Sequence, residues 1–130
     1  MKTDDVTLHF NPDFVGSMSS PTGTIPLGDQ EGGMQPYHLL YGALASCFYA
    51  TFLGVVEKKR LTFSHAEMNI SGVKRESIPT TLETVTIELI IHKPSDEAQF
   101  QKAALLGAKY CSIHETISRV ATINLVVRFS

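Results

Sequence analysis

The segment 39–56 constrains the fold of this chain more than any other part of the sequence. It reads LLYGALASCFYATFLGVV, eighteen residues without a single charge. Pro36 stands just before it, and proline is favoured at the first position of a helix. We therefore expect one long helix over 36–59. A helix that is apolar on every side is either buried all round or crosses a membrane.

A membrane span is the weaker of these two alternatives. Such a span needs about 20 predominantly apolar residues, and this run is shorter and contains Gly42, Ser46 and Gly54. The N-terminal stretch MKTDDVTLHF is too polar for a signal peptide or an anchor. We expect a cytoplasmic protein with no membrane partner, in which a sheet or a partner subunit wraps the helix.

Strand-like and helix-like patterns occupy separate parts of the remaining sequence. Residues 1–35 contain turn motifs such as Asn11-Pro12-Asp13. Apolar residues alternate over 82–92, which is typical of a half-buried strand, and more weakly over 63–73. Helices are expected at 97–110, with Ser95 as N-cap, and at 111–120. This order predicts an α+β fold with helices on one face of a mainly antiparallel sheet.

The chain length predicts a single domain over 1–130. We expect an N-terminal β-rich part at 1–35 and the central helix at 36–59. A strand pair at 63–92, two helices at 95–120 and a last strand at 122–129 should follow. The net charge is -2, and no basic cluster exceeds Lys58-Lys59-Arg60. Nucleic acid is therefore not expected as a partner.

The chain has only two cysteines, Cys47 inside the apolar helix and Cys111 much later. Cys47 has two interpretations: a small buried hydrophobe, or a redox thiol in an apolar pocket. The second requires another thiol within reach and something that lowers the pKa. Cys111, at a break between helical segments and near Lys109, is the candidate. Spacing alone does not show that the two sulfurs meet.

A metal site is not expected from the spacing of the histidines. Cys111 and His114 lie three residues apart, which places them on one helical face as half of a metal site or as a Cys–His activation pair. No second pair has the spacing of a usual metal site, because the other histidines are scattered through the chain. They are His9, His38, His65 and His92.

Several motifs, in their order along the chain, resemble the OsmC/Ohr family of osmotically inducible and organic-hydroperoxide-resistance proteins. They are GMQPYHLL at 33–40, ALASC at 43–47, IPTTLE at 78–83 and AKYCSI at 108–113. The resemblance extends from about Gly32 to the end of the chain. It implies an intertwined α+β homodimer in which two long helices share a core wrapped by sheets from both chains.

The resemblance also implies an activity, a thiol-dependent peroxidase that acts in oxidative-stress defence. Cys47 would attack an organic hydroperoxide and become a sulfenic acid, and Cys111 would condense with it into a disulfide. An external dithiol reductant would restore both thiols, with no other cofactor. The apolar pocket, which lies at the dimer interface in this family, suits alkyl or lipid hydroperoxides.

The sequence departs from the hydroperoxide-reducing members at two positions. Those members carry a glutamate after the helix-opening proline and an N-terminal arginine, which together orient the attacking thiol and lower its pKa. Here Tyr37 follows Pro36, and residues 1–35 contain no arginine. Arg75, Arg119 or a residue of the partner subunit could replace the arginine. The alternative function is a non-peroxidatic dimer that binds an apolar small molecule.

Overall fold

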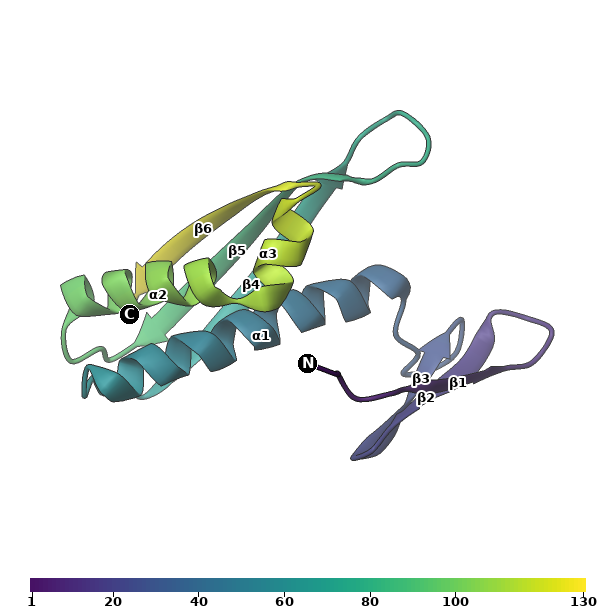
Figure 1. The fold of residues 1–130 in the computed structure, drawn as a ribbon, viewed down its shortest axis with the longest axis horizontal. Helices are drawn as coiled ribbons and strands as arrows, with labels where there is room; N and C mark the ends of the chain where they lie inside the picture. Colours follow the sequence, from purple (N-terminus) through teal and green to yellow (C-terminus); the bar gives the residue numbers. More distant parts are fainter. The chain divides into compact units, whose positions relative to one another are not determined.

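The computed structural model describes all residues from 1 to 130 and has an α+β fold with two three-stranded sheets and one long helix (Figure 1). The chain divides into two compact units, residues 1–40 and 41–130. Their boundary falls inside α1, the helix Pro36–Lys58. The expectation of a single domain over 1–130 stays a prediction.

The first unit is built on a small antiparallel sheet. Its strands β1 (Thr7–Phe10), β2 (Val15–Ser20) and β3 (Gly23–Gly28) pair in the order β1-β2-β3. Gly28 has a φ of +84°, and a Cβ at this position would collide with the carbonyl oxygen of Phe14. Only glycine fits this left-handed, crowded position.

The second unit contains a mixed sheet. β4 (His65–Lys74) pairs antiparallel with β5 (Leu82–His92), and β6 (Thr122–Phe129) pairs with β5 in parallel. Parallel neighbours need a crossover connection, usually helical. Here α2 (Glu97–Tyr110) and α3 (Ser112–Ser118) supply it, and Figure 1 shows them lying over the sheet. Three of the four strand pairings in the chain are antiparallel, as expected of a mainly antiparallel protein.

Asp96, and not the expected Ser95, caps α2. The Asp96 carboxylate accepts a hydrogen bond from the backbone N–H of Gln99 at 3.1 Å. The hydroxyl of Ser95 accepts one from the backbone N–H of Thr62 at 3.0 Å and so ties the loop before β4 to the start of α2. Both residue types are favoured caps, and sequence order alone did not separate them.

The core of the second unit forms where α1 meets the buried face of β5 and the helix α2. α1 buries one stripe of residues spaced four apart. Phe52 in this stripe packs near the rings of Phe48, Phe63 and Phe100, at centroid distances of 6.1–6.3 Å. From β5, alternate side chains are fully buried. The buried residues of α1 and β5 are Leu44, Phe48, Phe52, Val56, Leu82, Val85, Ile87, Leu89 and Ile91.

A single chain covers only one side of α1. The helix is long and apolar enough to cross a membrane by length and composition, yet one stripe of it forms part of the core of this fold. Only 22% of its most apolar window is buried within the chain. The expectation of a helix buried on all sides is therefore not met by one copy of the chain, and the uncovered apolar surface needs another explanation.

Candidate functional site

The two cysteines lie together where α1 meets the junction of α2 and α3. The sulfur of Cys47 lies 3.8 Å from the hydroxyl oxygen of Ser112, the residue after Cys111. The Cys111 thiol lies close enough to the Cys47 sulfur for each cysteine to shift the pKa of the other. Both are free thiols. The fold thus brings together two groups that are separated by 64 positions in the sequence.

Cys111 joins the two helices of the crossover. Its backbone is extended, with φ −77° and ψ 120°, so it ends α2 and caps α3 at once. Its sulfur accepts the backbone N–H of His114 at 3.4 Å. The side chain is 0% exposed, as is common for a small apolar thiol. This extended position places the Cys111 side chain beside α1.

The environment lowers the pKa of Cys47. Burial acts to raise this pKa, but hydrogen bonds outweigh it. They come from the backbone N–H of Ile113, the thiol of Cys111, and the hydroxyl and backbone N–H of Ser112. Each of these favours the thiolate. Cys47 is also only half-buried, so an incoming molecule has access to its sulfur.

The environment of Cys111 acts in the opposite direction. Burial is the main cause of its raised pKa, and the neighbouring Cys47 sulfur raises it further. The backbone N–H of His114 only partly offsets these effects. Of the two thiols, Cys47 therefore ionises first while Cys111 keeps its proton.

No arginine of the chain takes part in lowering the pKa of Cys47. Of the two considered from sequence, Arg75 donates to the carbonyl of Pro79 at 2.9 Å, and Arg119 pairs with Glu115 at 2.8 Å. Hydrogen bonds alone produce the shift within this chain. The donors from Ser112 and Ile113 were not predicted from the sequence, although a serine after a cysteine at the start of a helix is the pattern that could have indicated them.

His114 does not form the activation pair considered from sequence. It contacts Cys111 through its backbone N–H, and its imidazole makes no hydrogen bond to either thiol. Burial lowers the pKa of this imidazole, and Glu115 partly opposes the effect. The reacting groups are therefore the two thiols with their backbone and hydroxyl donors.

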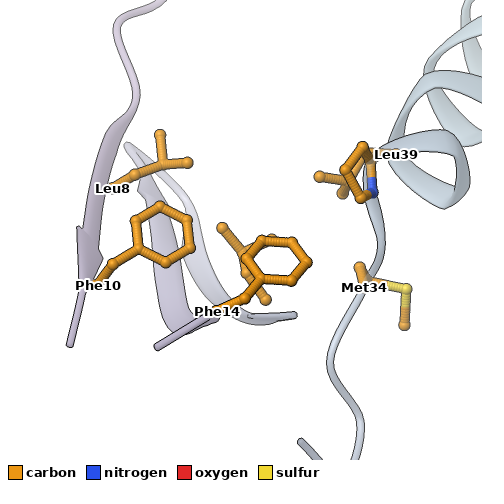
Figure 2. A pocket seen from close by; sticks show the side chains of 7 residues that line it. Leu8, Phe10, Phe14, Met34 and Leu39 are labelled. Carbon is orange, nitrogen blue, oxygen red and sulfur yellow. The ribbon is translucent and has the colours of Figure 1, made fainter. Parts of the chain in front are cut away.

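A separate apolar pocket lies within the first unit. It has a volume of about 130 Å³ and no polar lining. Figure 2 shows the side chains of β1, of the loop after it and of the start of α1 around the same space, with Phe10 and Phe14 stacked at a centroid distance of 6.0 Å. Its lining residues are Leu8, Phe10, Phe14, Leu27, Met34, Pro36 and Leu39. This pocket was not predicted from the sequence.

Comparison with known proteins identifies one family and several solved structures with a similar fold. A family model described as OsmC-like protein matches residues 28–126. No curated protein is similar enough to count as a relative. An OsmC-like protein from Mycoplasma pneumoniae is 25% identical, with a TM-score of 0.86 over 98% of this chain and 97% of that one.

Two further solved structures have the same fold at lower identity. A hypothetical protein from Aquifex aeolicus VF5 is 22% identical, with a TM-score of 0.85 over 100% of this chain and 99% of that one. The organic hydroperoxide resistance protein OhrB of Bacillus subtilis is 18% identical, with a TM-score of 0.70 over 98% of both chains. At these identities, the two likenesses concern the fold.

Proposed function

The chain belongs to the OsmC-like family, and on this premise we propose that it is a thiol-dependent peroxidase that reduces organic hydroperoxides in oxidative-stress defence. One observation carries the proposal. A half-buried Cys47 with a lowered pKa lies beside the fully buried Cys111, with its sulfur 3.8 Å from the hydroxyl oxygen of the adjacent Ser112. A thiolate is the nucleophilic form of cysteine, and a second thiol beside it can resolve the oxidised product.

The proposed reaction begins at the Cys47 sulfur. The thiolate attacks the terminal oxygen of the hydroperoxide, the O–O bond breaks, and the alkoxide leaves and is protonated to the alcohol. Cys47 becomes a sulfenic acid. The Cys111 sulfur then attacks the Cys47 sulfur, water leaves, and a disulfide forms. An external dithiol supplies two electrons and two protons, restores both thiols and is itself oxidised.

The local geometry supports this division of roles between the cysteines. The attacking thiol must meet the substrate and be ionised, and Cys47 is the more accessible of the two, with the lower pKa. The resolving thiol needs only to reach the sulfenic acid. Burial is compatible with that role, and Cys111 is 0% exposed. No metal or bound cofactor enters any step.

The proposed assembly is a cytoplasmic homodimer. The family resemblance implies a homodimer, and one copy of this chain leaves most of the apolar surface of α1 uncovered. A second copy would cover it and enclose an apolar environment near Cys47. Such an environment favours alkyl or lipid hydroperoxides over hydrogen peroxide. OhrB, one of the similar structures, is itself named an organic hydroperoxide resistance protein.

The test is the rate at which the reduced protein loses free thiols. Stopped-flow mixing with cumene hydroperoxide is expected to consume two thiols per chain rapidly, and hydrogen peroxide should react more slowly. Cys47→Ser should abolish the reaction. Cys111→Ser should retain the first step and accumulate a sulfenic acid that dimedone traps. Thiol loss no faster than that of a free cysteine would contradict the peroxidase proposal.

A second candidate function is the binding of an apolar small molecule without turnover. It is favoured by Tyr37 in place of a glutamate, by the lack of arginine in 1–35, and by the apolar pocket of the first unit. Titration with a fluorescent fatty acid tests it, with Phe14→Ser in the pocket expected to weaken binding and Leu105→Ser on exposed α2 surface as control. Equal binding by both variants would exclude the pocket as the site.

A further inference from the structure

Three potential metal ligands gather on one face of the β4–β5 pair. His65 and His92 are directly opposite each other in the antiparallel register. Glu67 follows two residues after His65, and residues two apart on a strand share a face. The register thus places two imidazoles and one carboxylate together, although the histidines are far apart in the sequence.

The side chains of these residues converge. The two imidazole rings lie 4.2 Å apart between centroids and are within 9° of parallel. The Nε2 atom of His92 lies 2.7 Å from the Oε1 atom of Glu67. One potential ligand atom from each of the three residues lies within 4.8 Å of the other two.

The cluster lies on the open face of its sheet. In β5 the buried residues Leu89 and Ile91 alternate with Ile90 and His92. His92 and Ile90 therefore face away from the core. His65 and Glu67 are exposed on β4. Water and dissolved ions therefore reach all three side chains.

The Glu67 carboxylate has no lysine or arginine partner. Its one ion-pair contact is with His92, which carries charge only when protonated. Further along the same face, Glu88 is held differently, because Asn69 and Arg128 donate to it at 2.8 and 2.9 Å. A negative group beside two imidazoles, with no fixed cation, is suited to a metal ion.

We propose that His65, Glu67 and His92 bind one divalent transition-metal ion, with Zn²⁺ as the representative. Zinc accepts nitrogen and carboxylate oxygen ligands at about 2.0–2.2 Å, which places ligand atoms roughly 3.3 Å apart in a tetrahedral site. The His92 and Glu67 ligand atoms lie 2.7 Å apart and all three lie within 4.8 Å of one another, so small side-chain rotations reach this value. Water completes the coordination.

The donor set also determines the class of ion. Two imidazoles and one carboxylate suit Zn²⁺, Co²⁺, Ni²⁺ or Cu²⁺, whereas Ca²⁺ and Mg²⁺ prefer oxygen ligands. The hydroxyl of Ser64 lies 2.8 Å from the Nδ1 atom of His65. Such an outer hydrogen bond fixes the orientation of a metal-binding imidazole.

The experiment uses the full chain with both cysteines changed to serine, because thiolates also bind zinc. Isothermal titration with ZnCl₂ measures the stoichiometry and affinity, and a Co²⁺ titration reports coordination by its visible absorption. We expect one ion per chain. His65→Asn, Glu67→Gln and His92→Asn should each weaken binding by about 10-fold or more.

The matched control is His9→Asn. His9 is likewise an exposed strand histidine, on β1 and outside the cluster. Its replacement should leave affinity and the Co²⁺ spectrum unchanged. Zinc should also raise the Tm of the cysteine-free protein and of His9→Asn, but not that of His92→Asn. Absence of stoichiometric binding, or binding by the three cluster variants as tight as that of the cysteine-free protein with the intact cluster, would overturn the proposal.

Discussion

At the scale of single residues, the main feature is a thiol with a lowered pKa and no charged partner. The donors around Cys47 are backbone N–H groups, a hydroxyl and a second thiol. Dipoles that point at a sulfur stabilise a thiolate as a cation does, but their effect is short-ranged. The site therefore depends on how closely α1 approaches the residues Cys111 to Ile113.

The first prediction concerns the pH dependence of thiol reactivity. Only the thiolate reacts with iodoacetamide, so a lowered pKa moves the rise in rate to lower pH, and a raised pKa moves it to higher pH. Cys47 should therefore be alkylated at lower pH than a free cysteine, and Cys111 at higher pH. Mass spectrometry of the two cysteine peptides measures both curves. Reversed order of the midpoints would contradict the assigned roles.

The second prediction isolates the hydroxyl of Ser112. Ser112→Ala removes a donor 3.8 Å from the Cys47 sulfur, so the pKa of Cys47 should rise and its alkylation at pH 7 should slow. The expected factor is at most about 10, the value of one hydrogen bond of about 1.4 kcal/mol. Ser118→Ala is the control, because that hydroxyl, in the same helix, donates to the carbonyl of Glu115. An equal effect in both variants would indicate general loosening of α3.

At the scale of secondary-structure elements, the site depends on the contact between α1 and α2. Gly107 on α2 faces Phe52 on α1 so closely that a Cβ would lie 3.1 Å from the Cα of Phe52 and 3.2 Å from its backbone nitrogen. The atoms that would have to move belong to the backbone of a long helix. Gly107 thus permits the close approach that also places the thiols side by side.

The third prediction follows from this contact. Gly107→Ala gains about 1 kcal/mol of helix propensity but introduces overpacking that costs typically 1–3 kcal/mol. We expect a net loss of about 1 kcal/mol in the free energy of unfolding, measured by urea denaturation, and slower oxidation of the thiols. Gln101→Ala, at an exposed position of the same helix, should change the stability little. A more stable Gly107→Ala protein would show that the helices can separate without strain.

Patterns that depend on neighbouring residues could be predicted from the sequence, and long-range register could not. The alternation at Val85, Ile87 and Leu89 predicted the buried face of β5, and the uncharged run predicted a long helix that begins at Pro36. The parallel pairing of β6 with β5 follows from how the crossover helices pack. That packing leaves no signal in the strand sequence itself.

The sites show the same division between local and long-range information. The two cysteine motifs were visible as candidates, but the contact of Cys47 with Cys111 depends on tertiary packing. His65 and His92 looked scattered because only the β4–β5 register places them opposite each other. Asp96 and not Ser95 is the N-cap of α2, because the Ser95 hydroxyl accepts a hydrogen bond from the backbone N–H of Thr62 instead.

At the scale of the whole molecule, the uncovered side of α1 is the feature that a single chain does not explain. Leu53, an apolar residue in the uncharged segment of this helix, is 38% exposed. Burying apolar surface contributes about 25 cal/mol per Å² to stability. A dimer in which a second copy covers α1 would therefore be stabilised along the whole length of the helix. A dimer built in this way would share the apolar surroundings of Cys47 between two chains.

The last prediction tests this assembly. Analytical ultracentrifugation of the wild-type chain should give a dimer, and Leu53→Glu should shift it toward monomer, because a charge buried at an apolar interface without a partner is strongly unfavourable. Leu105→Glu is the matched control: Leu105 is 62% exposed on α2, and its charge would remain in water in either state. If both variants remain dimeric, α1 is not the interface. If Leu53→Glu becomes monomeric and keeps its peroxide reactivity, the thiol pair functions within one chain; if it loses that reactivity, the second copy completes the environment of Cys47.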